Sequence, residues 1–383
     1  MGIVFSTVLI DLIGFGIVLP LLPLYAERFG ATPTAIGALT ASYAFCQFVF
    51  APLWGRASDR YGRRPVILVS LVGTCLASVL FGVADALWLL FLARALDGIS
   101  GASYGAAQAY VADVTSPEER TRGMGLIGAA FGVGFVIGPA LGALCAIASP
   151  RLPFFVAAGL AAANFALAWR RLPEPPRAPR ATPRPTRRSL IARAVGDRDL
   201  APLVWISFLG SLAFVGMEAT FALFGERRFD YGLVETGLVF TYIGVVAAVV
   251  QGALVARIVR RIGETRTLLA GLWGTGVALA LIPACYSTWA LLVVMLLVAG
   301  ASGLVFPTVT ALFSKAAGAE DQGGLLGVLA SSGGLARILA PVGATALFQH
   351  VGIATPYLVG AVLFAGCALL AVRGVGRHSP AVA

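Results

Sequence analysis

Long apolar stretches with few charged residues recur along the whole chain, and short polar segments separate them. A membrane-spanning helix needs about 20 such residues, whereas a spanning strand shows about 10 residues of alternating polarity. The chain has long runs, such as residues 66–84 and 289–312, and shows no such alternation. The pattern therefore predicts an all-α polytopic membrane protein.

We count twelve apolar segments, at residues 3–24, 35–54, 66–84, 88–111, 123–147, 153–169, 202–224, 235–255, 267–285, 289–312, 323–347 and 355–372. After the sixth comes the proline- and arginine-rich segment RRLPEPPRAPRATPRPTRRS (Arg170–Ser189), which can form neither a membrane span nor a core. The sequence therefore predicts an N-terminal six-helix bundle at 1–170, a cytoplasmic linker at 171–200, a C-terminal six-helix bundle at 201–373 and a cytoplasmic tail at 374–383.

The two halves align with each other at a nearly constant offset, which indicates an internal repeat. Residues 118–143 align with 320–344 at an offset of 202, so that Pro139 meets Pro341. Residues 53–68 align with 254–269 at an offset of 201, where Asp59 meets Arg260. Parallel repeats of this kind are typical of transporters, which place the substrate site between the halves and rock them around it.

Charged residues are few and unevenly placed. They make up 12% of a chain that is 58% hydrophobic, and the net charge is +10. Of the 28 Lys and Arg residues, 22 lie in segments on one predicted side of the membrane and four on the other. Because cytoplasmic loops carry the excess of Lys and Arg, we expect both termini in the cytoplasm. The expected location is the inner or plasma membrane of the cell. Topology accounts for this charge, so no nucleic-acid partner is expected.

Other residue types exclude further classes of protein. The five cysteines are far apart in apolar runs and show no metal-binding spacing. We find no nucleotide-binding loop and no nucleophile arrangement, so neither an enzyme nor a primary pump is expected. We expect no metal site and no organic cofactor. The expected partners are the lipid bilayer and a small-molecule substrate, and the expected oligomeric state is a monomer.

The segment GRASDRYGRR, residues 55–64, lies between the second and third apolar segments. It resembles the loop 2–3 signature of the major facilitator superfamily at Gly55, Asp59, Arg60, Gly62, Arg63 and Arg64. The resemblance covers the whole chain and implies the major facilitator fold. It also implies a conformational lock in which Asp59 meets a helix end or a basic group, with Arg63 and Asp113 as candidates. Topology alone would explain the arginines, and this simpler interpretation stays open.

Two further segments narrow the resemblance. DLIGFGIVLPLLP, residues 11–23, is similar to the first helix of drug–proton antiporters, especially tetracycline efflux pumps. GVGFVIGPALGA, residues 132–143, resembles the antiporter motif at Gly138, Pro139 and Gly142, with Gly134 as part of the same glycine run. Glycines four residues apart let helices approach closely, and the proline bends its helix. Tight packing alone would also explain the glycines.

Among the charged residues within predicted spans, Asp11, Arg94, Asp97 and Glu218 are the candidates for coupling, whereas Arg337 is expected to pack or to extend toward the membrane surface. A carboxylate at mid-membrane costs roughly 2.5–3.5 kcal/mol on insertion scales, so it must pair, protonate or face water. Asp11 is a candidate for proton coupling or for binding a substrate cation, or it bonds to backbone near a helix break. Arg94 and Asp97 share a helix face and form either a local ion pair or, as the resemblance implies for Arg94, a coupling pair. Glu218 either binds a cation or a proton, or is solvated at the periplasmic surface. The proton is the expected coupling ion.

The substrate pocket is expected to be apolar with a few polar groups. Its candidates are Phe15, Tyr43, Gln47, Tyr104, Gln108, Phe131, Phe135, Phe214, Phe221, Tyr242, Gln251 and Phe306. The tetracycline pumps that the chain resembles most carry a histidine in helix eight and an acidic residue in helix nine, and this chain has neither. We expect a proton-coupled efflux antiporter for a hydrophobic or amphipathic compound. An importer or metabolite exporter on the same fold is the alternative, and a non-transporting scaffold is a third.

Overall fold

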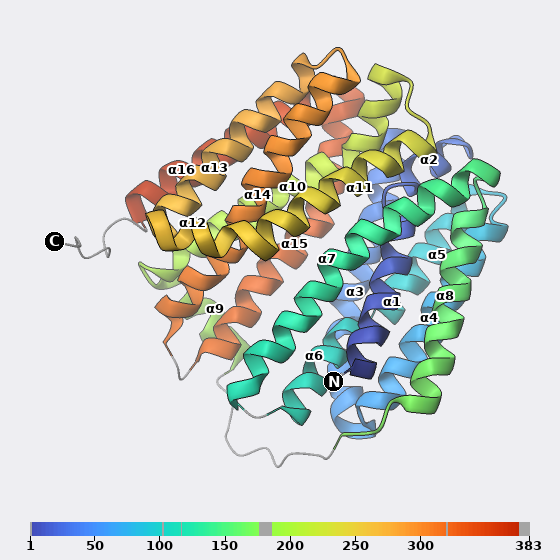
Figure 1. The fold of residues 1–383 in the computed structure, drawn as a ribbon, viewed down its shortest axis with the longest axis horizontal. Coiled ribbons are helices and arrows are strands. Elements are labelled where there is room, and N and C mark those ends of the chain that lie inside the picture. The colour runs from blue at the N-terminus through green and yellow to red at the C-terminus, as the bar shows by residue number, and fades with distance from the viewer. Residues whose placement is uncertain (1, 102, 116, 176–185, 319–320, 375–383) are drawn as a thin grey trace. The chain divides into compact units, whose positions relative to one another are not determined.

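The structure is a computed structural model that describes residues 2–101, 103–115, 117–175, 186–318 and 321–374. These residues form helices and connecting turns, and no strand occurs among them (Figure 1). In chain order the helices are α1 (Gly2–Val18), α2 (Leu22–Glu27), α3 (Pro33–Tyr61), α4 (Arg63–Val83), α5 (Leu87–Ser100), α6 (Ser103–Val114), α7 (Pro117–Ala148), α8 (Leu152–Arg171), α9 (Arg187–Gly196), α10 (Leu200–Phe229), α11 (Leu233–Val249), η1 (Val250–Leu254), α12 (Val255–Ile262), α13 (Glu264–Leu281), η2 (Ile282–Ala284), α14 (Thr288–Ala317), α15 (Gln322–His350) and α16 (Thr355–Gly374).

In the described part of the chain, ten helical stretches are long and apolar enough to cross a membrane. Each matches one predicted segment. The other two predicted segments are also helical, but each is broken: the first by the turn between α1 and α2, and the fourth between α5 and α6. The predicted all-α fold with twelve membrane segments is confirmed.

Both breaks occur where the sequence removes helix stability. The first follows α1 at Pro20, which cannot donate a backbone hydrogen bond and whose ring collides with the preceding turn. The second lies at Gly101, whose φ of −67° and ψ of 40° leave the helical region. Glycine interrupts a helix more easily than any residue except proline. We expected a single helix at each place, and the difference comes from these local residues.

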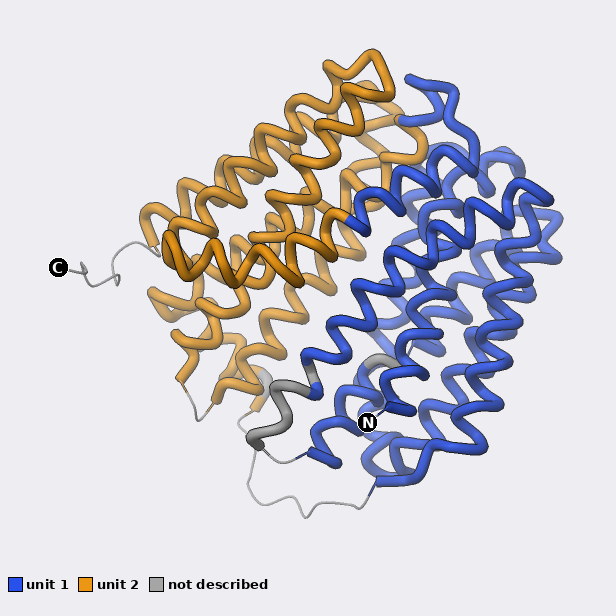
Figure 2. The backbone as a smooth tube through the Cα atoms, viewed as in Figure 1, with its two compact units in different colours: residues 1–180, 225–245 blue, residues 181–224, 246–383 orange. Residues whose placement is uncertain are grey.

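Unit 1 comprises residues 1–180 and 225–245 (Figure 2). In it α1 packs against α7 and α8, and α4 packs against α8 and α5. Part of its core is an apolar cluster from α1, α4, α6 and α7, in which Leu71 and Ala130 are fully buried. This arrangement fixes α1 and α7, which carry two of the predicted motifs, against each other.

Unit 2 comprises residues 181–224 and 246–383, of which 181–185, 319–320 and 375–383 lie outside the described residues (Figure 2). Its central helix is α13, which packs against α14 and α16 and buries Leu268 and Leu272 fully. The units differ from the sequence-based division because residues 225–245 group with unit 1. The domain boundaries at residues 170, 200 and 373 stay a prediction.

The predicted linker contains a helix that we did not expect. Thr186 caps α9, with its side chain accepting a hydrogen bond from the Ser189 N–H. Arg193 of α9 forms an ion pair with Asp321 and donates to the Ala317 carbonyl oxygen at 3.4 Å. Residues 187–196 are therefore attached to the ends of α14 and α15 in unit 2.

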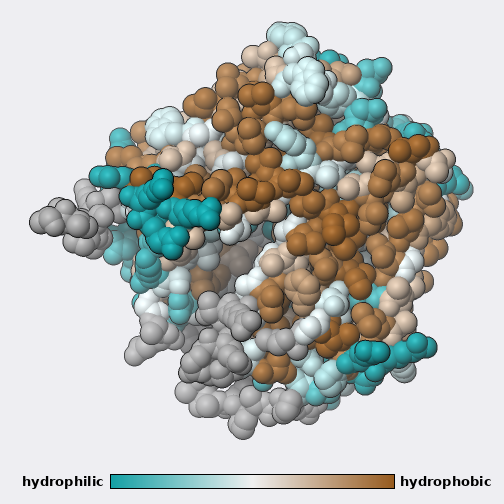
Figure 3. Space-filling model, in the orientation of Figure 1, coloured by the Kyte–Doolittle hydropathy of each residue, from teal (hydrophilic) through white to brown (hydrophobic). Residues whose placement is uncertain are grey.

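Large apolar side chains are exposed along the helices, among them Trp88, Leu144 and Val362. Figure 3 shows such residues over much of one face, with hydrophilic side chains gathered at α12. Soluble monomers rarely expose apolar patches of this extent. The surface is that of a multi-pass membrane protein.

Candidate functional site

Arg63 is the centre of a charged network at the junction of α3 and α4. Its Nε donates to Asp113 Oδ2 at 2.8 Å, and its Nη1 donates to Asp59 Oδ1 at 2.9 Å and to Ser58 Oγ at 3.0 Å. Charge-assisted hydrogen bonds between the guanidinium and the two carboxylates hold these side chains together. The structure thus brings Asp59, Arg63 and Asp113 together, and their role as a lock stays a prediction.

Glu174 also belongs to this network, and the sequence analysis missed it. The backbone N–H groups of Arg63 and Arg64 donate to its two carboxylate oxygens at 2.6 and 3.0 Å. A carboxylate at a helix N-terminus satisfies unpaired donors and is favoured by the helix dipole. The only signal in the sequence is one acidic residue among prolines and arginines just after α8, and we had assigned that stretch to a solvated linker.

Glycine is required at residue 62 for two reasons. Its φ is +112°, a conformation that residues with a side chain rarely adopt. A Cβ there would also lie 2.7 Å from Cδ of Glu174. The other motif residues lie at the periphery: Gly55 and Arg60 are exposed, and Arg64 Nη2 donates to the Trp169 carbonyl oxygen at 2.6 Å.

Arg94 lies on α5 and is only 1% exposed. Its Nη1 is 3.6 Å from Asp97 Oδ2, and its guanidinium carbon is 5.3 Å from the ring centre of Tyr43 and 5.8 Å from that of Phe81. Neither Nε nor Nη1 makes a hydrogen bond to a residue that the structure describes. A buried cation is thus held by one carboxylate and two aromatic faces, an arrangement in which small changes of charge have large effects.

The predicted coupling residues form one cluster in unit 1, except Glu218. Asp97 interacts electrostatically with both Arg94 and Asp11, and it hydrogen-bonds to the side chain of Thr74. Asp11 is half-buried on α1. Glu218 lies on α10 in unit 2, where its electrostatic neighbour is Arg337 of α15. Its place in proton coupling stays a prediction.

The glycines of the antiporter motif face α1. A Cβ on Gly138 would lie 2.7 Å from the Gly16 Cα, and one on Gly134 would lie 2.8 Å from the Leu12 Cβ. Gly142 approaches the Ile17 carbonyl oxygen, at 3.1 Å from a Cβ. The close approach of α1 and α7 therefore depends on the absence of side chains at these positions.

Two glycines of α11 make a similar approach to another face of α7. A Cβ on Gly237 would lie 3.1 Å from the Pro139 carbonyl oxygen and 2.9 Å from the Ala143 Cβ. A Cβ on Gly244 would lie 2.7 Å from the Phe135 carbonyl oxygen. Ala143 replaces the last glycine of the antiporter motif, and its methyl group lies against Gly237. Sequence reasoning missed both α11 glycines, because nothing in an apolar run tells which helix a glycine faces.

The predicted pocket residues divide between the units. In unit 1 the Phe15 and Tyr43 ring centres are 5.6 Å apart, and Gln47 Nε2 donates to the Tyr43 hydroxyl and the Gly101 carbonyl, each at 3.2 Å. Unit 1 also holds Gln108, Tyr242 and the stacked pair Phe131 and Phe135. Unit 2 holds Gln251, the edge-to-face pair Phe214 and Phe306, and Phe221, which is 1% exposed. The side chain of Tyr104 lies outside the described residues. The pocket stays a prediction. One of its predicted residues, Tyr43, contacts Arg94 through its ring.

Comparisons with known proteins agree with this architecture. The family model described as Major Facilitator Superfamily matches residues 4–269 and 253–382. The class G tetracycline resistance protein of Vibrio anguillarum is 34% identical over 367 residues, covering 94% of this chain and 93% of that protein. Multidrug resistance protein 1 of Bacillus subtilis (strain 168) is 30% identical, covering 91% and 89%. The crystal structure of the human organic anion transporter MFSD10 (TETRAN) is 28% identical with a TM-score of 0.73, covering 97% of this chain and 98% of that one.

Proposed function

The chain belongs to the major facilitator superfamily, and we propose that it is a proton-coupled exporter of hydrophobic or amphipathic small molecules that works by alternating access. Relatives that cover most of the chain are named tetracycline resistance and multidrug resistance proteins. They do not favour the alternative of an importer or metabolite exporter. We further propose that both termini face the cytoplasm and that the chain acts as a monomer.

The observation that carries the proposal is the cluster of the buried Arg94 with the half-buried Asp97 and Asp11 beside Tyr43. A proton that binds Asp97 removes the negative charge that offsets Arg94, so the guanidinium is left with only aromatic neighbours. Binding of a proton and binding of a substrate near Tyr43 are then coupled, and the coupling is reciprocal. An antiporter results when each ligand weakens the binding of the other.

The substrate class follows from the lining that we propose. Phe15, Tyr43 and Gln47 offer flat aromatic faces next to polar groups, and these suit planar amphipathic compounds. Tetracyclines are therefore the first compounds to test. Because the chain lacks the helix-eight histidine and the helix-nine acid of the pumps it resembles, we propose other planar drugs as equal candidates.

The test uses inverted membrane vesicles with a preformed pH gradient. Addition of a transported drug should dissipate the gradient with the wild-type chain. Asp97→Asn and Asp11→Asn should each reduce this drug-dependent proton flux at least tenfold. Asp85→Asn is the matched control, because Asp85 is exposed in the loop before α5. Full coupled flux in both cluster variants would refute the assignment of the proton site.

A further inference from the structure

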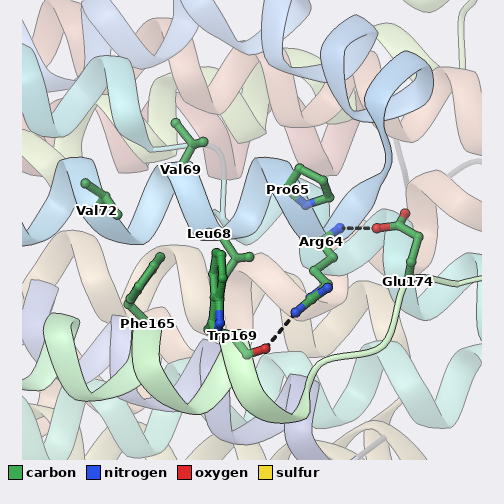
Figure 4. A pocket seen from close by; sticks show the side chains of 8 residues that line it. All are labelled: Arg64, Pro65, Leu68, Val69, Val72, Phe165, Trp169 and Glu174. Atoms are coloured by element: carbon green, nitrogen blue, oxygen red, sulfur yellow. Dashed lines mark hydrogen bonds between the residues drawn. The ribbon is translucent and has the colours of Figure 1, made fainter.

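A groove lies on the surface of unit 1 between α4 and α8 and is lined by the eight residues labelled in Figure 4. It encloses about 470 Å³. Its walls are apolar: Leu68 lies on the α4 side and Phe165 on the α8 side. Val69 is 54% exposed and Trp169 is 59% exposed, so the groove opens outward. Both helices are membrane spans by length and composition, and the opening therefore faces the surface that the bilayer covers.

One end of the groove is polar. Arg64 lies there, half-buried, with its guanidinium carbon 5.9 Å from the ring centre of Trp169. Its Nη2 donates to the Trp169 carbonyl oxygen, and its Nε is buried without a hydrogen bond. No carboxylate forms an ion pair with Arg64 among the described residues. The charge of the guanidinium is therefore available to a ligand.

Glu174 shares this end but does not cancel that charge. Both of its oxygens accept backbone N–H groups at the start of α4, from Arg63 and Arg64. Its negative charge is thus offset by the positive end of the helix dipole. Arg170 and Arg171 follow Trp169 at the end of α8, and both are exposed, which adds positive charge at the same level.

We propose that this groove is a binding site for an anionic phospholipid, with the phosphate at Arg64 and one acyl chain along Val69 and Val72. The dimensions agree, because the helix from residue 64 to residue 72 rises about 12 Å, from the helix end into the apolar region. A soluble anion would gain nothing from the apolar walls, and a zwitterionic lipid would gain less from Arg64 because its own ammonium group offsets its phosphate. The proposal does not depend on the transported substrate.

The internal repeat supplies a control within the same chain. At the offset of 201, Arg64 corresponds to Thr265 and Val72 corresponds to Trp273. The second half therefore has no arginine at the position equivalent to Arg64, and Arg266 is one residue further along α13. Trp273 is 47% exposed on α13, so lipids reach it as they reach Trp169. The site is expected in the first half alone.

The experiment reconstitutes the full chain into vesicles of phosphatidylcholine that contain increasing fractions of brominated phosphatidylglycerol or brominated phosphatidylcholine. Bromine quenches tryptophan fluorescence on contact, and the signal of Trp169 is the difference between wild type and Trp169→Phe. We expect half of the Trp169 fluorescence to be quenched at a lipid fraction of brominated phosphatidylglycerol that is about fivefold lower than the fraction of brominated phosphatidylcholine needed. This factor corresponds to about 1 kcal/mol for one basic group near a lipid surface. Trp273, isolated by Trp273→Phe, should show no such preference.

Variants separate the groove from general surface attraction. Arg64→Gln should reduce the fivefold preference at Trp169 to about one, whereas Arg64→Lys should keep most of it. Arg171→Gln, at the same level but outside the groove, should leave at least half of it. Val69→Phe narrows the groove and should reduce the preference without changing charge. The elution volume of each purified variant checks that it is folded. Equal quenching by the two lipids in wild type, an equal preference at Trp273, or an equal loss in Arg171→Gln and Arg64→Gln would overturn the proposal.

Discussion

Arg94 is a cation buried to 99%, and two of its nitrogens make no hydrogen bond to any described residue. Its ion-pair partner among the described residues, Asp97, is 3.6 Å away, too far for a strong charge-assisted bond. Removing one member of a buried pair leaves the other uncompensated, whereas removing both can stabilise a protein. Residues kept at such a cost point to function rather than to stability.

The pair therefore makes a prediction about stability. The double variant Arg94→Met/Asp97→Leu, which replaces the pair with apolar side chains, should unfold at a higher temperature than either single variant, and at or above that of wild type. Where buried ion pairs in other proteins were replaced by apolar residues, the free energy of unfolding rose by up to about 1–4 kcal/mol. Thermal unfolding of the purified chains in one detergent measures this. A double variant that is less stable than both single variants would show that the pair stabilises the fold.

Arg94→Lys gives a separate prediction for transport. Lysine keeps the charge but loses the flat group that lies over the rings of Tyr43 and Phe81. We expect drug-dependent proton flux in inverted vesicles to fall about tenfold or more, while the amount of folded chain in the membrane is unchanged. Flux equal to wild type would mean that charge alone matters at this position.

At the scale of the elements, glycines decide which helices touch. α7 lies close to α1 through Gly134 and Gly138, and close to α11 through Gly237 and Gly244. Lipid tails are as apolar as the helix surfaces, so the hydrophobic effect does not drive helices together in a bilayer. Close packing is therefore a main source of helix association. The antiporter motif is therefore the shared surface of three helices of unit 1, and its tolerance to added volume is low.

Gly138→Ala should destabilise the chain, since its Cβ would meet the backbone of Gly16 at 2.7 Å and a backbone cannot rotate away. Overpacking of this kind costs about 1–3 kcal/mol. Gly128→Ala is the matched control on the same helix, because a Cβ there meets nothing within 4 Å. The melting temperatures of the two variants should differ clearly, with Gly128→Ala at or above wild type. Equal values would contradict the packing argument.

The two helix junctions related by the repeat allow a second comparison. Gly62 and Gly263 both have positive φ, of +112° and +82°, but only Gly62 lies against Glu174. Gly62→Ala should therefore lower the melting temperature more than Gly263→Ala. In a Glu174→Ala background, which itself loses a helix cap, the added cost of Gly62→Ala should shrink toward that of Gly263→Ala. An unchanged cost would remove Glu174 from the explanation.

At the scale of the whole molecule, the uneven distribution of arginine predicts the orientation in the membrane. A cysteine at Arg56, exposed in the last two turns of α3, should react with a membrane-impermeant maleimide in inverted vesicles and not in intact cells. A cysteine at Arg28, exposed in the loop after α2, should show the reverse. The chain with all native cysteines replaced provides the background. Reaction of both sites from one side would refute the predicted topology.

The sequence predicted those features that depend on residues close together along the chain. Apolar runs predicted all twelve membrane segments, because bilayer thickness fixes their length. Breaks at Pro20 and Gly101 were missed because a long apolar run hides a local turn. Glu174 and Gly237 were missed for another reason: the partners of each lie far along the chain, at residues 63–64 and 139–143. Asp59, Arg63 and Asp113 lie together in the structure although Asp113 is distant in sequence, and the lock that the family resemblance implies for them stays a prediction.

The linker is attached at both ends: Glu174 is fastened to the start of α4, and α9 is fastened to α14 and α15 by Arg193. Only twelve residue steps separate Glu174 from Thr186, and a fully extended chain of that length spans at most about 40 Å. The distance between Glu174 and Thr186 therefore has a fixed upper limit. Any movement that accompanies transport must keep the two residues within that distance of each other.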